Sequence, residues 1–203
     1  MTIKKYHSDL LICGCDEAGR GALAGPVVAS AVMLKNDFFH PDLNDSKKLS
    51  KNKRIQLAKY IKTKSLQWSI GIINVKEIDK INILNSSIKA MHIAIDEIIK
   101  KSEKKPELLI IDGNKFNPYP NINHKCIIKG DAKFASIAAA SIIAKTHRDT
   151  IMHKLHIKYP EYNWLCNNGY PTKEHRKQII SYGISIHHRK SFKLLEKQYT
   201  LQL

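Results

Sequence analysis

The sequence predicts an α/β fold in which helices flank a mixed β-sheet. Near the N-terminus, two apolar segments are joined by a short glycine-containing connection, which is typical of an antiparallel pair of strands. Farther along the chain, segments with strand and helix periodicity alternate, as in layered α/β proteins. At 203 residues the chain is somewhat longer than a domain of roughly 150 residues, so we expect one domain over residues 1–203.

Each expected strand is a short apolar segment bounded by glycine, proline or polar turn residues. In chain order the expected strands are residues 10–15, 26–34, 66–73, 108–111 and 126–128. The first two form the antiparallel pair, and the fourth has the continuous apolar character of a buried strand.

Apolar residues recur at helical spacing in three longer segments, residues 51–61, 83–99 and 134–156. Ser50 is a suitable N-cap for the first of these helices, and Pro106 prevents continuation of the second. We expect a short fourth helix over residues 172–182, in a C-terminal region that also contains aromatic, glycine and basic residues.

The chain is strongly basic, with 34 Lys and Arg against 18 Asp and Glu and a formal net charge of +16. This excess suits a polyanionic partner, nucleic acid or an acidic membrane surface, better than a neutral metabolite. The hydrophobic content of 43% and charged content of 26% are ordinary for a globular protein and argue against disorder, collagen-like repeats and coiled coil.

No segment predicts a membrane span or a secretory signal. The longest nearly apolar segment, 135–144, is about half of the roughly 20 residues that cross a bilayer. The apolar segment at 10–15 is also shorter than a typical signal core of roughly 7–15 residues. We expect a cytoplasmic protein in which the 4 cysteines are reduced structural thiols, because they show no CxxC pair.

Four acidic residues lie where strands are expected to end. Asp16 and Glu17 follow the first strand, Asp112 follows the fourth, and Asp131 lies between the fifth strand and the long helix. Ligands collect at the carboxyl ends of strands in α/β sheets, so these side chains could converge there. Carboxylates at close range need cations, and Mg²⁺ or Mn²⁺ prefer oxygen ligands. A metal site is therefore expected if the four acids converge.

Each acid also has a structural explanation. Asp112-Gly113-Asn114 is ordinary turn chemistry, and Asp131 could cap the helix that follows it. The metal-site hypothesis therefore depends on the combination of the four.

Gly19-Arg20-Gly21 forms a second candidate site, because glycines let a backbone approach a ligand and arginine is a forked donor to phosphate. A tight hairpin turn is the alternative. A nucleotide-triphosphate loop is disfavoured, since Arg20-Gly21 stands where Lys-Ser/Thr would be needed. Further basic groups at Lys47 and Lys48, at Lys145 with Arg148, and at 187–190 could follow a phosphate backbone or simply form solvated faces.

Residues 15–21, Cys-Asp-Glu-Ala-Gly-Arg-Gly, with Leu-Ala-Gly-Pro-Val-Val at 23–28, resemble the opening signature of bacterial ribonuclease HII. Further motifs follow in that family's order: Asp-Ser-Lys-Lys-Leu at 45–49, Glu-Ile-Asp at 77–79, Asn-Ile-Leu at 82–84, Ile-Asp-Gly-Asn at 111–114, Lys-Gly-Asp at 129–131, Ala-Ala-Ala-Ser-Ile-Ile-Ala-Lys at 138–145 with Arg148 and Asp149, and Asn-Gly-Tyr-Pro-Thr at 168–172 with His175. The resemblance spans about residues 10–192. Ala22 departs from it, since the family has proline after Gly-Arg-Gly.

The resemblance implies a ribonuclease H-like mixed sheet flanked by helices, with a C-terminal helical extension at about 160–203 that closes over the substrate. It also implies that Asp16, Glu17, Asp112 and Asp131 are the catalytic carboxylates and hold Mn²⁺ or Mg²⁺. Two ions about 3.5–4 Å apart could activate a water and stabilise the leaving 3′ oxygen. Cleavage on the 5′ side of a ribonucleotide would leave a 3′-hydroxyl and a 5′-phosphate, and no protein base is required.

The implied substrates are RNA–DNA hybrids and single ribonucleotides embedded in duplex DNA, and the implied roles are removal of misincorporated ribonucleotides and of RNA primers. Only the 2′-hydroxyl marks a ribonucleotide within DNA. The family recognises it with residues that match Gly19, Arg20, Gly21 and Tyr170, and Lys47 matches a phosphate-contacting lysine. Without the resemblance, Tyr170 would be interpreted as a buried aromatic residue. We expect a monomer, and a contact with the replication machinery stays open.

Three alternatives remain. A non-catalytic basic nucleic-acid-binding protein would need only the positive charge, and a generic nuclease would also cut plain DNA. Ribonuclease HIII is disfavoured, because the residues before the first expected strand leave no room for its extra N-terminal domain. No spacing among the 10 histidines resembles a zinc site.

Overall fold

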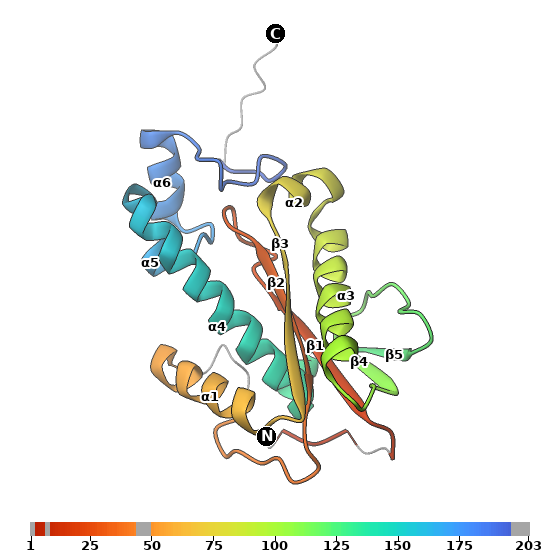
Figure 1. Ribbon diagram of the computed structural model, residues 1–203. Helices are drawn as coiled ribbons and strands as arrows, with labels where there is room; N and C mark the ends of the chain where they lie inside the picture. Colours follow the sequence, from red (N-terminus) through yellow and green to blue (C-terminus); the bar gives the residue numbers. More distant parts are fainter. Residues whose placement is uncertain (1–2, 7–8, 44–49, 196–203) are drawn as a thin grey trace.

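A computed structural model describes residues 3–6, 9–43 and 50–195 of the chain (Figure 1). Within these ranges one mixed sheet has the strand order β3-β2-β1-β4-β5. The strands are β1 (Ile12–Ala18), β2 (Val27–Met33), β3 (Gln67–Ile73), β4 (Leu108–Asp112) and β5 (Asn123–Ile127). β2 is antiparallel to both β1 and β3, whereas β4 is parallel to β1 and β5 is parallel to β4. The predicted mixed sheet is confirmed.

β1 extends farther than the sequence predicts. Asp16 and Glu17 do not follow the strand but belong to it, since they pair with Ser30 and Ala29 of β2. The apolar pattern ends at Cys15 because the next two side chains are acidic, yet the backbone ladder with β2 continues to Ala18. The hydrogen-bonded ladder, and not the hydrophobic pattern, sets the end of this strand.

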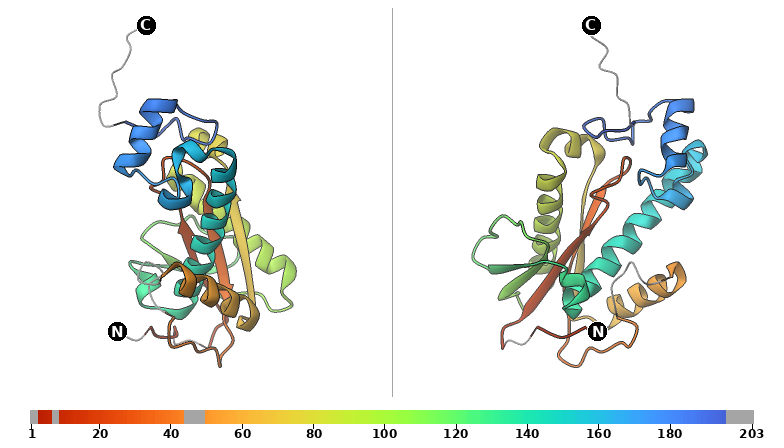
Figure 2. Two further views of the ribbon diagram at one scale, coloured as in Figure 1. Left: turned by 90° about the vertical axis from the view of Figure 1, so that its left-hand side faces the viewer. Right: turned by 180° about the vertical axis from the view of Figure 1, so that it is seen from behind.

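The helices lie on both faces of the sheet (Figures 1 and 2). They are α1 (Lys51–Lys64), α2 (Val75–Ile81), α3 (Ile83–Lys101), α4 (Ala135–Lys158), α5 (Trp164–Asn167) and α6 (Lys173–Tyr182), with 3-10 turns η1 (Gly130–Ala132) and η2 (Pro160–Tyr162). α4 packs along β1 and β2 and carries α1 on its outer side, whereas α3 covers β2 and β3 on the opposite face. The layered α/β prediction is therefore confirmed.

Small residues let α4 lie very close to the centre of the sheet. A Cβ atom at Gly14 of β1 would stand 2.3 Å from the carbonyl carbon of Ser136, so only glycine fits there. Ala138, Ala139 and Ala140 of α4 are fully buried. The alanine-rich start of the long helix thus reflects a tight helix–sheet contact.

Side-chain caps confirm three predicted helix starts, and the structure contains two short helices that the sequence pattern missed, α2 and α5. At the start of α1, α3 and α6, the side chains of Ser50, Asn82 and Thr172 accept the amides of Lys53, Asn85 and His175 respectively. α2 and α5 were not predicted, because seven and four residues are too few for a helical apolar period to be recognised. Asn82, at φ 63°, separates α2 from α3.

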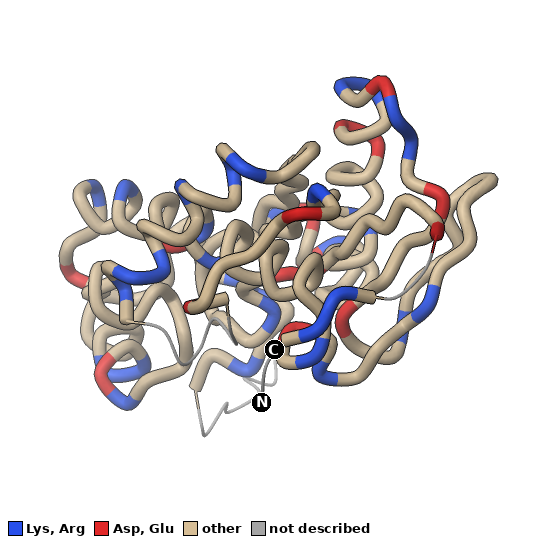
Figure 3. Tube along the Cα trace, turned by 90° about the horizontal axis from the view of Figure 1, so that it is seen from below, with Lys and Arg blue, Asp and Glu red and all other residues tan. Residues whose placement is uncertain are grey.

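Within the described ranges, no helix combines the length and the apolar character that crossing a membrane requires. All four cysteines are free thiols: Cys13 and Cys15 are buried in β1, and Cys126 and Cys166 are exposed. Lys and Arg are not gathered on a single element (Figure 3). Among the helices and strands of the described ranges they occur on α1, α2, α3, α4, α6 and β5.

Candidate active site

An open cavity of about 450 Å³ lies at the carboxyl ends of β1 and β4. Because these two strands are parallel neighbours, their ends meet at one edge of the sheet. The cavity is lined by Asp16, Glu17, Ala18, Gly19, Arg20, Gly21, Arg54, Asp112, Ser141, Lys145 and Tyr170. Of the nine candidate residues, seven therefore share one cavity, although they come from distant parts of the sequence.

Three carboxylates form the acidic side of this cavity. Asp16 is 5% exposed, and its Oδ1 atom accepts the Glu17 amide at 2.7 Å. Asp112 ends β4, and its Oδ1 atom accepts the Gly130 amide at 2.7 Å. The Glu17 Oε1 atom lies 3.2 Å from the Arg20 guanidinium. The backbone and Arg20 thus fix the orientation of the acids.

Burial and mutual repulsion raise the pKa of two of these acids. Burial raises the pKa of Asp16 well above its usual value, and the charges of Glu17 and Asp112 raise it further. Burial also raises the pKa of Glu17, with Arg20 opposing the change. Holding these like-charged groups together lowers the stability of the folded protein, and a bound cation would remove their repulsion.

Asp131 lies beside the cavity and does not line it. It belongs to η1, is 4% exposed, and directly follows Gly130, whose amide binds Asp112. Asp131 is not the N-cap residue of the long helix. α4 starts at Ala135 with Phe134 as its N-cap residue and without a side-chain cap bond.

The donor set of the cavity suits a hard divalent ion, since all its acidic ligands are carboxylate oxygens. As the side chains stand, no three His, Cys, Asp or Glu residues of the described ranges form a ready metal-ligating group. Like charges keep carboxylates apart unless a cation lies between them. Asp16, Glu17 and Asp112 would therefore have to draw together around an ion, with Asp131 adjacent.

The predicted Gly-Arg-Gly turn borders the acidic side. Gly19 has φ 99°, and a Cβ atom there would stand 2.1 Å from Nε of Arg148, so both backbone angle and space require glycine. At Gly21 the equivalent position is open. Ala22 stands where the resemblance predicts proline, and its amide donates to the Gly19 carbonyl at 3.3 Å, a bond that proline cannot make.

Tyr170 lies on the same cavity and is half-buried, not a core residue. Its ring centroid lies 5.5 Å from Nζ of Lys145 and 5.1 Å from Cζ of Arg148. The preceding residue, Gly169, accepts the Leu23 amide at 2.8 Å, which ties the Tyr170 loop to the end of the Gly-Arg-Gly turn. The remaining substrate candidate, Lys47, lies outside the described residues.

Two basic residues that the sequence suggested for phosphate are buried instead. Arg148 and Arg189 are both 0% exposed. Arg148 donates to the carbonyls of Pro26, Ala24 and Asn168, and Arg189 donates to those of Gly25 and Arg20. Neither follows a phosphate backbone nor forms a solvated face. They hold the turn and the Tyr170 loop, a role that local charge runs in the sequence do not reveal.

Burial lowers the pKa of Arg189 to about 9, with the charge of Arg148 as a further cause. A buried guanidinium stays cationic only if hydrogen bonds offset the cost of its desolvation. Arg189 has such bonds to two carbonyls of the β1–β2 connection.

A buried histidine pair supports the loop from below. Trp164 donates from Nε1 to Nε2 of His175 at 3.0 Å, so Nδ1 of His175 carries the proton shared with the Tyr170 carbonyl. Nε2 of His188 lies 3.2 Å from Nε2 of His175, and burial lowers the pKa of His188 to about 4. These histidines are neutral packing groups rather than metal ligands.

A family model described as Ribonuclease HII matches residues 13–195. The chain belongs to the ribonuclease HII family. It is 55% identical over 201 residues to the Ribonuclease HII of Parabacteroides distasonis, covering 99% of both chains. It is 52% identical over 193 residues to that of Christiangramia forsetii, covering 95% of this chain and 96% of the relative.

Solved structures of ribonucleases H2, HII and HIII share the fold of this chain. The ribonuclease H2 of Pyrococcus horikoshii OT3 matches with a TM-score of 0.73 at 24% identity, covering 90% of this ribonuclease HII and 94% of that chain. The PCNA:RNase HII complex from Archaeoglobus fulgidus matches with a TM-score of 0.71 at 26% identity, covering 95% of this chain and 98% of that chain. Bst-RNase HIII in complex with Mn²⁺ matches with a TM-score of 0.66 at 19% identity, covering 86% of this chain and 63% of that chain.

Family membership settles the class of reaction. The protein is a type 2 ribonuclease H, an endonuclease that hydrolyses phosphodiester bonds, and metal binding is typical of its family. The non-catalytic alternative is therefore wrong at the level of the family, and the sequence resemblance is confirmed.

Proposed function

We propose that this ribonuclease HII cleaves the RNA strand of RNA–DNA hybrids and single ribonucleotides embedded in duplex DNA. The cut falls on the 5′ side of the ribonucleotide and leaves a 3′-hydroxyl and a 5′-phosphate. One observation carries the proposal: the acids Asp16, Glu17 and Asp112 share a cavity with the Gly-Arg-Gly turn and Tyr170. Groups suited to a metal ion and groups suited to a sugar thus face the same space.

The acidic side holds the metal in this proposal. Asp16, Glu17, Asp112 and Asp131 would supply carboxylate oxygens to Mg²⁺ or Mn²⁺, and the Mn²⁺ bound to Bst-RNase HIII, a protein of the same fold, supports such an ion. Divalent ions bound there would supply an activated water and stabilisation of the leaving oxygen. No side chain of the cavity then needs to act as a base.

The opposite side reads the sugar. Gly21 has open space around it, so the backbone of the turn can approach a 2′-hydroxyl closely. The Tyr170 ring would stack against the neighbouring sugar and detect the change from RNA to DNA. The region from residue 160 holds that ring in place and forms the substrate-binding part of a single domain over residues 1–203. Lys47 would add a phosphate contact.

The proposed cellular task is to remove misincorporated ribonucleotides and RNA primers. We propose that the protein acts as a monomer in the cytoplasm, where the bacterial chromosome is replicated. The PCNA complex of the Archaeoglobus fulgidus enzyme supports a contact with a replication clamp.

Single-turnover cleavage tests the proposal. The substrate is a labelled DNA duplex with one ribonucleotide, with Mg²⁺ or Mn²⁺ at fixed salt, and an all-DNA duplex is the matched control. We expect one cut, 5′ to the ribonucleotide, that the Asp131→Asn variant loses and that the all-DNA duplex does not show. Binding of every duplex without cleavage of any, or equal cutting of both, would contradict the proposal.

A further inference from the structure

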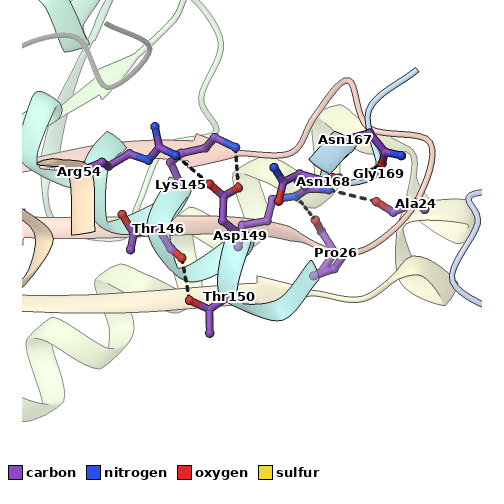
Figure 4. A network of polar contacts seen from close by, with 11 residues as sticks. Ala24, Pro26, Arg54, Lys145, Thr146, Asp149, Thr150, Asn167, Asn168 and Gly169 are labelled. Atoms are coloured by element: carbon purple, nitrogen blue, oxygen red, sulfur yellow. Dashed lines mark hydrogen bonds and ion pairs between the residues drawn. The ribbon is translucent and has the colours of Figure 1, made fainter. Parts of the chain in front are cut away.

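The cavity also has a basic side, to which the proposed function assigns no role. Arg54 of α1 and Lys145 of α4 line it together with the carboxylates. Both cations contact Asp149, with Arg54 NH2 3.0 Å from Oδ2 and Lys145 Nζ 2.5 Å from Oδ1 (Figure 4). One acid therefore orients two cations from different helices toward one space.

The three side chains are too buried for an ordinary surface ion pair. The exposed fractions are 12% for Arg54, 24% for Lys145 and 8% for Asp149. Each oxygen of Asp149 has its own cation, so the carboxylate holds both in place. One negative charge against two positive charges leaves the group with a net charge of +1, directed at a cavity whose opposite side is acidic.

Lys145 also lies next to the residue proposed to stack on the sugar. Its ammonium is 5.5 Å from the centre of the Tyr170 ring. A nucleic-acid strand carries a phosphate on each side of every sugar, so a sugar held by Tyr170 brings a phosphate close to this ammonium. Arginine offers a planar fork to phosphate and lysine a point charge, and the cavity presents one of each.

We propose that Arg54 and Lys145 form a binding site for a backbone phosphate of the cleaved strand, with Asp149 as the positioning residue. This inference rests on the proposed function, because it places the strand between the carboxylates and Tyr170. The phosphate enters as a third partner of the cation pair while Asp149 keeps both cations in place.

Binding measured without catalysis tests the site. The dissociation constant of the ribonucleotide-containing duplex is measured in EDTA over a range of salt concentrations. A lysine that contacts phosphate contributes about 1 to the slope of log Kd against log salt. We expect Lys145→Gln and Arg54→Gln each to weaken binding and to reduce the slope by about 1.

Lys101→Gln is the matched control. Lys101 also pairs with an acid one helical turn away, since its Nζ lies 2.7 Å from Glu97. It is the last residue of α3, the helix on the opposite face of the sheet from α4, and it does not line the cavity. The control should keep the wild-type slope. If Lys145→Gln and Arg54→Gln behave like Lys101→Gln, the phosphate site is refuted.

Asp149→Asn distinguishes positioning from simple neutralisation, because the two predict opposite signs. The substitution removes a negative charge, so a mere neutralising role predicts tighter binding of the duplex. A positioning role predicts weaker binding, with Lys145→Arg retaining affinity because it keeps a charge that Asp149 can hold. Thermal melting of each variant checks that the compared proteins are folded. If Asp149→Asn does not fold, Lys145→Arg is compared with Lys145→Gln: a positioning role predicts that Lys145→Arg keeps the affinity and the salt slope that Lys145→Gln loses, and equal losses in both variants would contradict it.

Cleavage by the wild type separates this inference from the proposed function. If the wild type cuts at the ribonucleotide and the Lys145 and Arg54 variants bind and cut as well as the control, only the phosphate site fails. If the wild type does not cut, the proposed function itself fails.

Discussion

Two regions of the molecule bury charge in opposite ways. At the carboxyl ends of β1 and β4, Asp16 and Glu17 are held near Asp112, and their pKa values are raised by burial, with the charges of neighbouring acids adding to the effect. Beneath the Tyr170 loop, Arg148 and Arg189 are fully buried, but backbone carbonyls surround both guanidinium groups. The arginines are satisfied by the protein, whereas the acids repel one another.

This difference in how the charges are balanced distinguishes residues that bind a ligand from residues that stabilise the fold. Charges that the backbone satisfies stabilise a loop geometry, because removing them would leave carbonyls without donors. Charges that oppose one another cost stability and are retained where a ligand can balance them. The acidic side is therefore expected to gain stability from a cation, and the arginine side is expected to need none.

The largest expected effect comes from removing an acid. Asp16→Asn should reduce single-turnover cleavage by at least about 100-fold, the scale on which losing one transition-state-stabilising group acts. The same change should raise the melting temperature, because it removes a buried charge that Glu17 and Asp112 oppose. Melting curves and cleavage rates check both. Glu97→Gln, on an exposed ion pair of α3, is the control and should change neither.

Removing a satisfied arginine should have the opposite result. Arg148→Met leaves the carbonyls of Ala24, Pro26 and Asn168 without this donor. Each lost partner costs about 1–3 kcal/mol, so the unfolding free energy should fall by about 3 kcal/mol or more. Urea denaturation measures it. Arg20→Met removes a half-exposed arginine and should change stability little, so equal losses in both variants would erase the contrast between the two regions.

Tyr170 lies between the two regions and should show an intermediate effect. Tyr170→Ala removes a stacking ring, which is worth about 1–3 kcal/mol, or roughly 5- to 150-fold in cleavage of the ribonucleotide-containing duplex. Tyr170→Phe keeps the ring and should retain most activity. Cleavage that survives Tyr170→Ala unchanged would show that the ring does not contact the substrate.

The smallest expected effect is a pH dependence of opposite sign in the two regions. Asp16 and Glu17 have raised pKa values, so the folded state binds more protons than the unfolded chain and stability falls as pH rises from about 4. His188 has its pKa lowered to about 4, so stability falls as pH drops below about 6.5. Melting temperatures across this range should therefore rise with pH more steeply in Asp16→Asn than in the wild type. Curves of melting temperature against pH that run parallel in Asp16→Asn and the wild type would contradict the raised pKa of Asp16.

The sequence predicts the sheet and the long helices well, because periodicity and caps are local. Of the four acids that it predicts to gather, Asp16, Glu17 and Asp112 share one cavity at the carboxyl ends of β1 and β4, whereas Asp131 does not line it. It places the end of β1 too early, because two acidic side chains interrupt an apolar pattern while the backbone pairing with β2 continues.

The roles of the basic residues could not be predicted in the same way. Lys145 and Arg148 lie three positions apart on α4, yet one lines the cavity and the other is buried against the β1–β2 connection. The pairing of Arg54 with Asp149 joins residues 95 positions apart. Such long-range contacts depend on how α1 packs on α4, which no local pattern specifies.

Direct measurement of metal binding tests the contrast most directly. Calorimetric titration of Mn²⁺ into the wild type, Asp16→Asn and Arg148→Lys, with thermal melts at each end point, reports on the acids without requiring activity. We predict saturable binding that raises the melting temperature of the wild type, persists in Arg148→Lys and is lost in Asp16→Asn. Binding that is unchanged in Asp16→Asn would contradict the conclusion that the opposed acids hold the ion.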